Sequence, residues 1–132
     1  MTLREVLHAH LPTLTPESTV RDAVDKMDIY QFPALVILNP DRYPIGVITE
    51  GDLCRAVSQR GNLTSLAKEP AAAFGTPEPT IATGETEISD ALHRMLMSGL
   101  TVLPIVDNDR FAGVVLRVDL MQAMLMDLQE LA

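Results

Sequence analysis

The sequence predicts an α+β fold in which a β-α-β-β-α unit occurs twice and the two copies pack as one pseudo-twofold pair. The first observation is an internal duplication, because residues 19–27 match residues 87–95 at an offset of 68. The positions that coincide are Asp22 and Asp90, Ala23 and Ala91, and Met27 and Met95. The second observation is that residues 45–53 match residues 112–120 at an offset of 67. A period of about half the chain is too long for a solenoid unit and indicates one domain duplicated once.

Each copy is expected to open with a short extended segment, near residues 13–15 and 80–82, followed by an amphipathic helix. The helices are indicated by apolar residues at helical spacing behind capping candidates. In the first copy these are Val20, Ala23, Val24 and Met27, and in the second they are Ile88, Ala91, Leu92 and Met95. Two β-prone runs around a polar turn then predict a hairpin in each copy. The runs are 34–38 and 44–48 in the first copy, and 102–106 and 111–115 in the second. A further helix begins close to Asp52 or Asp119.

The segment between the copies is interpreted as a linker, because it carries helix-breaking residues around a short predicted helix at 63–68. These are Gly61, Pro70, Gly75, Pro77 and Pro79. The predicted boundaries are a first domain at 1–60, which includes a short N-terminal helix at 3–8, a linker at 61–79 and a second domain at 80–132. A copy of roughly 60 residues buries too little surface to be comfortably stable alone, so the copies are expected to pack together.

Composition and charge exclude several classes of protein. The chain has a formal net charge of -8 and a pI near 4.7, which repels nucleic-acid backbones and anionic membrane surfaces. No apolar run of about 18 residues and no secretory signal is present, so a cytoplasmic location is expected. The single cysteine, Cys54, cannot form an internal disulfide and is interpreted as a small buried residue. No Cys or His has the spacing of a structural metal site, and His8, His10 and His93 are interpreted as surface or capping residues.

The order of elements, together with the segment Gly46-Val-Ile-Thr-Glu-Gly-Asp-Leu53, resembles a pair of CBS (cystathionine-beta-synthase) domains, also called a Bateman module. The resemblance covers nearly the whole chain, and each half contains the apolar strand, the turn and a Gly-x-x-x-x-x-Asp-Leu segment in the family's order. It implies that adenine nucleotides or related adenosyl compounds bind in clefts between the two copies. The expected ligands are AMP, ADP, ATP or S-adenosylmethionine, and no cofactor is required.

The resemblance places the ligand contacts of the first copy on Thr49 and Asp52, which are expected to meet phosphate and ribose. A carboxylate accepts hydrogen bonds from ribose hydroxyls, and a hydroxyl plus the free N–H groups at a helix start donate to an anion. The adenine is expected to lie against backbone and apolar groups of the opening strand and the second strand. These positions are Thr13, Leu14, Pro33, Ala34 and Leu35.

The second copy departs from this pattern, because Leu116 occupies the threonine position while Asp119 remains. Loss of the hydroxyl removes a phosphate donor and adds bulk, so one good site is expected rather than two. Asp119 can still hold a ribose, and Arg117 is expected either to compensate or to reach phosphates in the neighbouring site.

The same residues also have a purely structural interpretation. Thr49 is a good N-cap residue and Asp52 falls at N3, a placement that stabilises a helix without any ligand. Two functions therefore stay open. One is a regulatory, energy-sensing module that signals to a separate effector protein, and the other is a ligand-free module that dimerises and docks proteins. An enzyme is not expected, because the sequence has no nucleophile–base pair, carboxylate pair, metal cluster or Gly-rich phosphate loop.

The final helix carries a wide apolar stripe, formed by Leu120, Met121, Met124, Leu125 and Leu128. A stripe wider than one packing face predicts contact with a helix of another chain. CBS pairs commonly dimerise through such helices, so a homodimer, parallel or antiparallel, is predicted. The initial Met favours a whole gene product.

Overall fold

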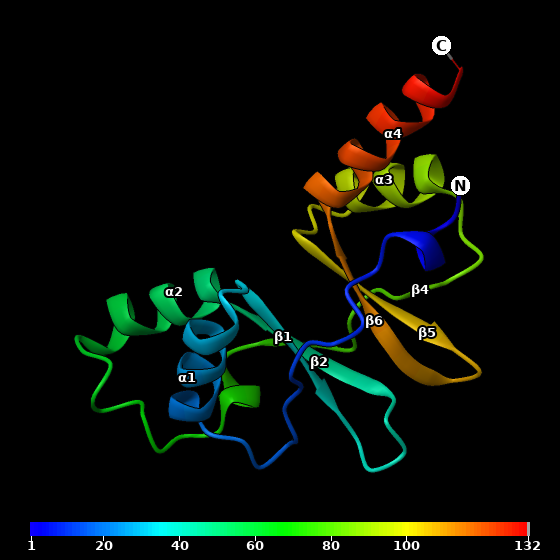
Figure 1. Cartoon of the computed structure of the whole chain (residues 1–132). Coiled ribbons are helices and arrows are strands. Elements are labelled where there is room, and N and C mark those ends of the chain that lie inside the picture. The colour runs from blue at the N-terminus through cyan, green and yellow to red at the C-terminus, as the bar shows by residue number, and fades with distance from the viewer. Residues whose placement is uncertain (132) are drawn as a thin grey trace. The chain divides into compact units, whose positions relative to one another are not determined.

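The computed structural model describes the backbone of residues 1–131 and the side chains of residues 1–126 (Figure 1). In chain order the elements are η1 (Leu3–Glu5), α1 (Val20–Tyr30), β1 (Ala34–Leu38), β2 (Pro44–Thr49), α2 (Glu50–Arg60), η2 (Ala71–Ala73), β3 (Thr76–Pro77), β4 (Ala82–Thr83), α3 (Ile88–Met97), β5 (Val102–Asp107), β6 (Arg110–Leu116) and α4 (Arg117–Leu131), where η marks a short 3-10 helix. The predicted α+β class is confirmed, because both copies contain the expected hairpin between two helices. Among the described residues, no helix has the length and apolar character needed to cross a membrane.

The chain forms two compact units whose limits differ from the boundaries expected from the sequence. The first unit is residues 11–79, and the second unit combines residues 1–10 with residues 80–132. The N-terminal ten residues, which were expected to belong with the first copy, therefore pack with the second copy. Residues 61–79, which were expected to form a linker, are part of the first unit.

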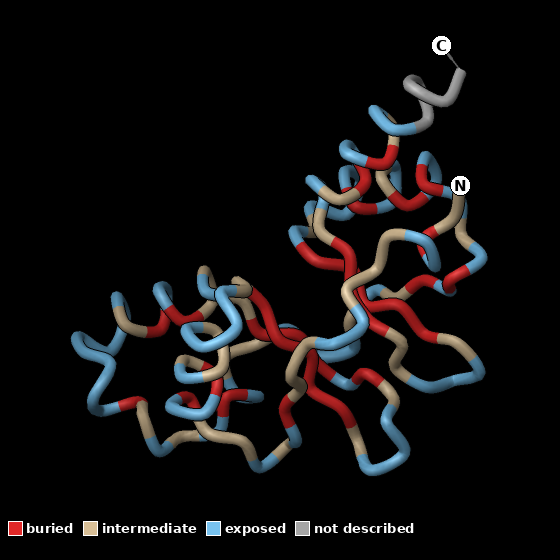
Figure 2. Tube along the Cα trace, in the orientation of Figure 1, coloured by how far each residue is buried: buried red, intermediate tan, exposed pale blue. Residues whose placement is uncertain are grey.

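The first unit contains a three-stranded antiparallel sheet in the order β1-β2-β3, with α1 and α2 packed beside it (Figure 1). Leu14 joins the outer side of β1 in parallel, where its N–H donates to the Val36 carbonyl at 2.9 Å. Figure 2 shows that buried residues line the strands and one side of each helix. The core cluster consists of Leu14, Val20, Ala23, Leu35, Ile37, Ile48, Leu53, Ala56, Leu66 and Ala71.

The predicted linker completes the first unit. Its residues 63–68 form a bend followed by turns and not the predicted helix, and Leu66 is fully buried in the core. The segment then runs antiparallel to β2, with Thr76 paired to Val47. Gly75 lies so close to β2 that an added Cβ would stand 2.5 Å from the Val47 carbonyl oxygen. Tertiary packing therefore decides the conformation of this segment, because the backbone pairing of Thr76 and the burial of the Leu66 side chain both depend on contacts with the first copy.

The second unit repeats this architecture with the sheet order β4-β5-β6. β4 is parallel to β5, and the β5–β6 hairpin is antiparallel, as the sequence predicted. The helices α3 and α4 pack against each other and against the sheet (Figure 1). The core cluster consists of Leu3, Ala82, Ile88, Ala91, Met95, Leu103, Ile105, Val115, Leu120 and Ala123.

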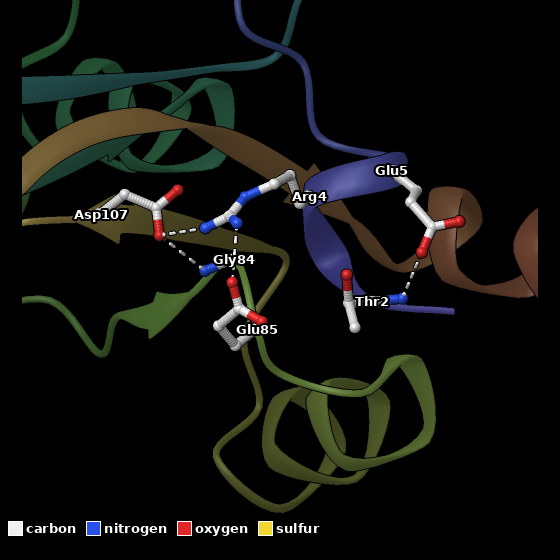
Figure 3. A network of polar contacts seen from close by, with 6 residues as sticks. All are labelled: Thr2, Arg4, Glu5, Gly84, Glu85 and Asp107. Atoms are coloured by element: carbon white, nitrogen blue, oxygen red, sulfur yellow. Dashed lines mark hydrogen bonds and ion pairs between the residues drawn. The ribbon is translucent and has the colours of Figure 1, made fainter.

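The N-terminal segment, residues 1–10, is held in the second unit by its backbone. The N–H of Leu3 donates to the Thr86 carbonyl, and the N–H of Arg4 donates to the Gly84 carbonyl, both at 3.0 Å. The Arg4 guanidinium also lies 2.8 Å from Asp107 and 2.7 Å from Glu85 (Figure 3). The hydrogen bond and the charge of Asp107 raise the pKa of Arg4 above its ordinary value, with a further contribution from the charge of Glu85.

The two leading segments have equivalent positions in the two units. A short 3-10 helix forms at residues 3–5 and again at 71–73, an offset of 68. His8 then pairs antiparallel with Val114, just as Thr76 pairs with Val47. The helix predicted at 3–8 is therefore limited to residues 3–5, because His8 is an edge partner of β6. The duplication extends further toward the N-terminus of each copy than the helix and hairpin motifs alone indicate.

Candidate functional site

The first candidate site lies where β2 ends and α2 begins. The Thr49 N–H donates to Asp52 Oδ2 at 2.9 Å, and the Asp52 N–H donates to Thr49 Oγ1 at 3.2 Å. This is a capping box, so the structural role predicted for both residues is confirmed. The second oxygen of Asp52, Oδ1, lies 2.5 Å from Nη2 of Arg55. The Asp52 side chain is 12% exposed, whereas the Arg55 side chain is 70% exposed. The carboxylate is therefore held in place, and its cationic partner is largely in solvent.

The start of β1 lies directly beside this junction. Ala34 pairs with Thr49 across the hairpin, and the Pro33 carbonyl accepts a hydrogen bond from the Glu50 N–H at 2.9 Å. Pro33 is half-buried, whereas Ala34 and Leu35 are 5% and 2% exposed. The structure therefore brings Pro33 and Ala34 next to Thr49 and Asp52.

The opening strand meets β1 farther from the junction. Leu14 is hydrogen-bonded between Val36 and Leu38 and is 1% exposed, whereas Thr13 is half-buried. The side chains of Leu14 and Leu35 both belong to the core cluster. A ligand near these two positions would therefore meet mainly backbone, whereas Thr13 keeps part of its surface accessible.

The corresponding junction in the second unit has a different partner for its aspartate. The Leu116 N–H donates to Asp119 Oδ2 at 2.7 Å, which preserves the backbone half of the capping box. His8 Nε2 lies 2.9 Å from the same oxygen, a distance at which a ring N–H donates to the carboxylate. The Asp119 side chain is 18% exposed, and Arg117 is exposed at the first position of α4. His8, whose side chain is 41% exposed, thus lies at the surface and is also part of the second candidate site, a contact that the sequence analysis did not expect.

Sequence reasoning missed His8 because the residue is 111 positions from Asp119. A signal was nevertheless present, since residues 3–10 and 71–78 hold the same place relative to the two duplicated helices. In that alignment His8 is equivalent to Thr76, a β-prone residue that occupies the same edge position in the first unit.

A pocket of about 630 Å³ lies between α1 and α2 in the first unit. Most of its lining is apolar, and the lining residues are Val24, Met27, Asp28, Gln31, Phe32, Pro33, Glu50, Leu53, Cys54, Val57 and Leu63. Cys54 is exposed, so the expectation that it would be buried is wrong, because it points away from the face of α2 that carries Leu53 and Ala56. Among the described residues, no group of three or more His, Cys, Asp or Glu side chains is arranged to hold a metal ion.

Known proteins match the chain in both sequence and fold. The model of the CBS domain matches residues 3–59 and 71–126. An uncharacterised 17.7 kDa protein of Acidianus ambivalens is 32% identical over 111 residues, which are 83% of this chain and 65% of the relative. An uncharacterised protein of Methanopyrus kandleri is 34% identical over 121 residues, which are 89% of this chain and 60% of the relative. The chain thus spans less than two thirds of either relative.

A solved structure shares the fold across almost the whole length. CBSX2, crystallised in complex with AMP, superposes with a TM-score of 0.81 at 22% sequence identity, covering 95% of this chain and 96% of CBSX2. The two family matches together span most of the chain and fall on its two copies. The chain therefore belongs to the CBS-domain family and carries two CBS domains.

Proposed function

We propose that this chain is a regulatory module that binds an adenosine-type ligand at the β2–α2 junction and signals to a separate partner protein. The observation that carries the proposal is the arrangement of Thr49 and Asp52 beside Pro33 and Ala34. It sets a hydroxyl and a carboxylate at the N-terminus of an eleven-residue helix, next to the start of β1. The likeness in fold to CBSX2, which was solved with AMP, supports the same ligand class.

The ribose and the phosphate of an adenosine-type ligand each have a suitable partner at this junction. The Asp52 carboxylate accepts hydrogen bonds from ribose hydroxyls once Arg55 turns aside, and Arg55 loses little because it is 70% exposed. The N-terminus of α2 and the Arg55 guanidinium both favour an anionic phosphate. A local cation matters here because the formal net charge of the chain, -8, repels phosphates.

Signalling follows from a difference in affinity between conformations. A ligand that binds one arrangement of the module more tightly enriches that arrangement, and a partner protein that prefers it then binds more often. A ligand-free docking module is the competing function, and it is favoured by the intramolecular partners that both aspartates already have. The two functions differ in whether Asp52 is needed for binding.

Replacing Asp52 with alanine is expected to abolish the stabilisation of the protein by its ligand. A ligand that binds only the folded state adds about 2.7 kcal/mol at a concentration about 100 times its Kd, which raises the melting temperature. The measurement is a thermal-shift screen of the unmodified protein and Asp52→Ala against AMP, ADP, ATP, S-adenosylmethionine and NADH. We expect a shift with at least one adenosine compound, absent in Asp52→Ala.

The chain offers a matched control in Asp22→Ala. Asp22 and Thr19 form a capping box at α1 with the same two distances, 2.9 and 3.2 Å, as Asp52 and Thr49. The backbone N–H of Thr19, together with its hydroxyl, lowers the pKa of Asp22 below its ordinary value. Loss of this cap reduces stability through the same mechanism, so Asp22→Ala should melt earlier but keep the full ligand shift. A ligand shift that survives in Asp52→Ala, or no shift with any compound, would favour the docking module.

We also propose that the partner interface includes a second copy of this chain, docked through α3 and α4. The described side chains of α4 include four that are apolar and about half exposed, namely Val118 (54%), Met121 (50%), Leu125 (56%) and Met126 (51%). Leu96 and Met97 of α3, the helix that packs against α4, are also apolar and exposed. Leu120, which the sequence analysis placed in the stripe, is fully buried, and the side chain of Leu128 lies outside the described residues.

Replacing Leu125 with glutamate is expected to convert the dimer to a monomer with little change in the stability of the monomer. The new carboxylate would lose its water in an apolar interface, whereas it stays hydrated in the monomer. Sedimentation equilibrium measures the change. The control is Gln59→Glu, which adds the same charge at an exposed position of α2 and should leave the dimer intact. An unmodified protein that sediments as a monomer would contradict this proposal.

A further inference from the structure

The two CBS domains of the chain differ in the side chain that bonds to the aspartate at the helix start. In the first unit the second partner of Asp52 is Arg55, which lies three residues ahead on the same helix and is 70% exposed. A long exposed side chain leaves such a contact at little cost, because exposed ion pairs contribute only about 0–1 kcal/mol. The carboxylate of the first unit is therefore available to a ligand.

In the second unit the partner of Asp119 is His8, and its backbone is fixed. The His8 N–H donates to the Val114 carbonyl at 2.8 Å, and the Val114 N–H donates to the His8 carbonyl at 3.2 Å. An added Cβ on Gly113 would stand 2.5 Å from the His8 carbonyl oxygen, so the segment lies directly on β6. Moving the imidazole away while the segment stays on β6 requires its own side-chain torsions to turn, and the imidazole is 41% exposed against 70% for Arg55.

Several contacts hold the N-terminal segment on the second unit. Leu3 is 0% exposed in the core of the second unit, and Arg4 bonds to both Asp107 and Glu85 (Figure 3). The backbone of His8 is therefore fixed on β6, and its imidazole lies beside Asp119 Oδ2, the oxygen that also accepts the Leu116 N–H. A ribose approaching this carboxylate meets an oxygen that already has two hydrogen-bond donors.

We propose that His8 closes the ligand position of the second CBS domain, so that the N-terminal segment is an autoinhibitory element and each chain binds a single adenosine-type ligand. This inference rests on the proposed function, because it concerns the second copy of the same kind of site. It names His8 as the residue that blocks the position, whereas the sequence alone pointed to Leu116.

The internal duplication supplies the variant that tests the inference. Thr76 occupies in the first unit the edge position that His8 occupies in the second. His8→Thr therefore removes the imidazole and keeps a β-prone residue on β6, where the pairing is made by backbone atoms. His8→Val serves as a second variant with the same strand preference. His10→Thr is the matched control, because His10 lies in the same segment and is exposed.

The measurement is the number of AMP molecules bound per chain at saturation, by equilibrium dialysis. We expect one in the unmodified protein and in His10→Thr, and two in His8→Thr and His8→Val. Leu116→Thr alone is expected to bind one, because His8 still occupies Asp119. In the Asp52→Ala background, the number should rise from none to one when His8→Thr is added.

The outcomes separate this inference from the proposed function. One AMP per chain in both the unmodified protein and the His8 variants overturns the inference and leaves the proposed function standing. A second AMP in Leu116→Thr but not in His8→Thr likewise overturns it, since leucine is then the block. No AMP in the unmodified protein but one in His8→Thr supports the inference and removes the proposed site at Asp52. No AMP in any variant overturns the inference, and the proposed function is overturned as well if the thermal-shift screen finds no other adenosine compound.

Discussion

Replacing Leu3 with alanine is expected to destabilise the second unit by about 2–5 kcal/mol, the range measured for buried leucine-to-alanine changes. Leu3 is 0% exposed and belongs to the core cluster that contains Met95, Leu103 and Leu120. The change removes packed atoms and leaves a cavity, because the neighbouring backbone is tied to Gly84 and Thr86. The first unit has a separate core cluster and loses none of these contacts.

Amide hydrogen exchange measures where the loss of stability appears. In Leu3→Ala, protection should fall in α3, β5 and β6 more than in β1 and β2. The matched control is Leu66→Ala, which removes the same number of atoms from a side chain that is 0% exposed in the first unit. Its loss of protection should fall on β1 and β2. Loss of protection confined to the first unit in Leu3→Ala would contradict the assignment of residues 1–10 to the second unit.

Replacing Gly113 with alanine is expected to cost about 3 kcal/mol, at the upper end of what overpacking costs. The new Cβ would stand 2.5 Å from the His8 carbonyl oxygen and 2.7 Å from a methyl carbon of Leu7. The first of these is backbone and cannot rotate away, so the N-terminal segment must shift off β6. The His8–Asp119 contact should be lost with it, because both depend on the same strand pairing.

The duplicated glycine in the first unit is the control. An added Cβ on Gly46 would stand 3.2 Å from the Cδ1 of Ile37 and 3.5 Å from the Thr76 carbonyl oxygen. A terminal methyl group can move by a few tenths of an ångström, so Gly46→Ala should cost about 1 kcal/mol or less. Urea unfolding of both variants gives the comparison. An equal loss of unfolding free energy in Gly113→Ala and Gly46→Ala would show that the N-terminal segment lies farther from β6 than in this structure.

Local patterns in the sequence were sufficient to predict the helices α1 and α3, both hairpins and the family. Apolar residues at helical spacing marked α1 and α3, and β-prone runs around polar turns marked both hairpins. These elements depend on residues close in the chain, so the periodicity of side chains contains the information. The Thr49–Asp52 capping box was predictable for the same reason, since its two residues are three apart.

Pairings between distant residues were not predictable in this way. Residues 61–79 contain the helix-breaking residues of a linker, and residues 3–8 have the composition of a short helix, yet both segments form edge pairings against the strands of a copy. An edge strand is stabilised by backbone hydrogen bonds, which any sequence other than proline can make, so side-chain patterns report it weakly. The exposure of Cys54 similarly depended on which face of α2 packs against the core.

By itself the sequence determined that this protein is a duplicated α+β chain, with CBS domains and with a threonine and an aspartate at the start of α2. Only the tertiary structure decided which leading segment completes which unit, and therefore that His8 reaches Asp119. The physical reason is that the contact joins residues 111 positions apart through the pairing of His8 with Val114. That pairing depends on the close approach of the His8 backbone to Gly113 and on the burial of Leu3, two contacts that exist only once the sheet has formed.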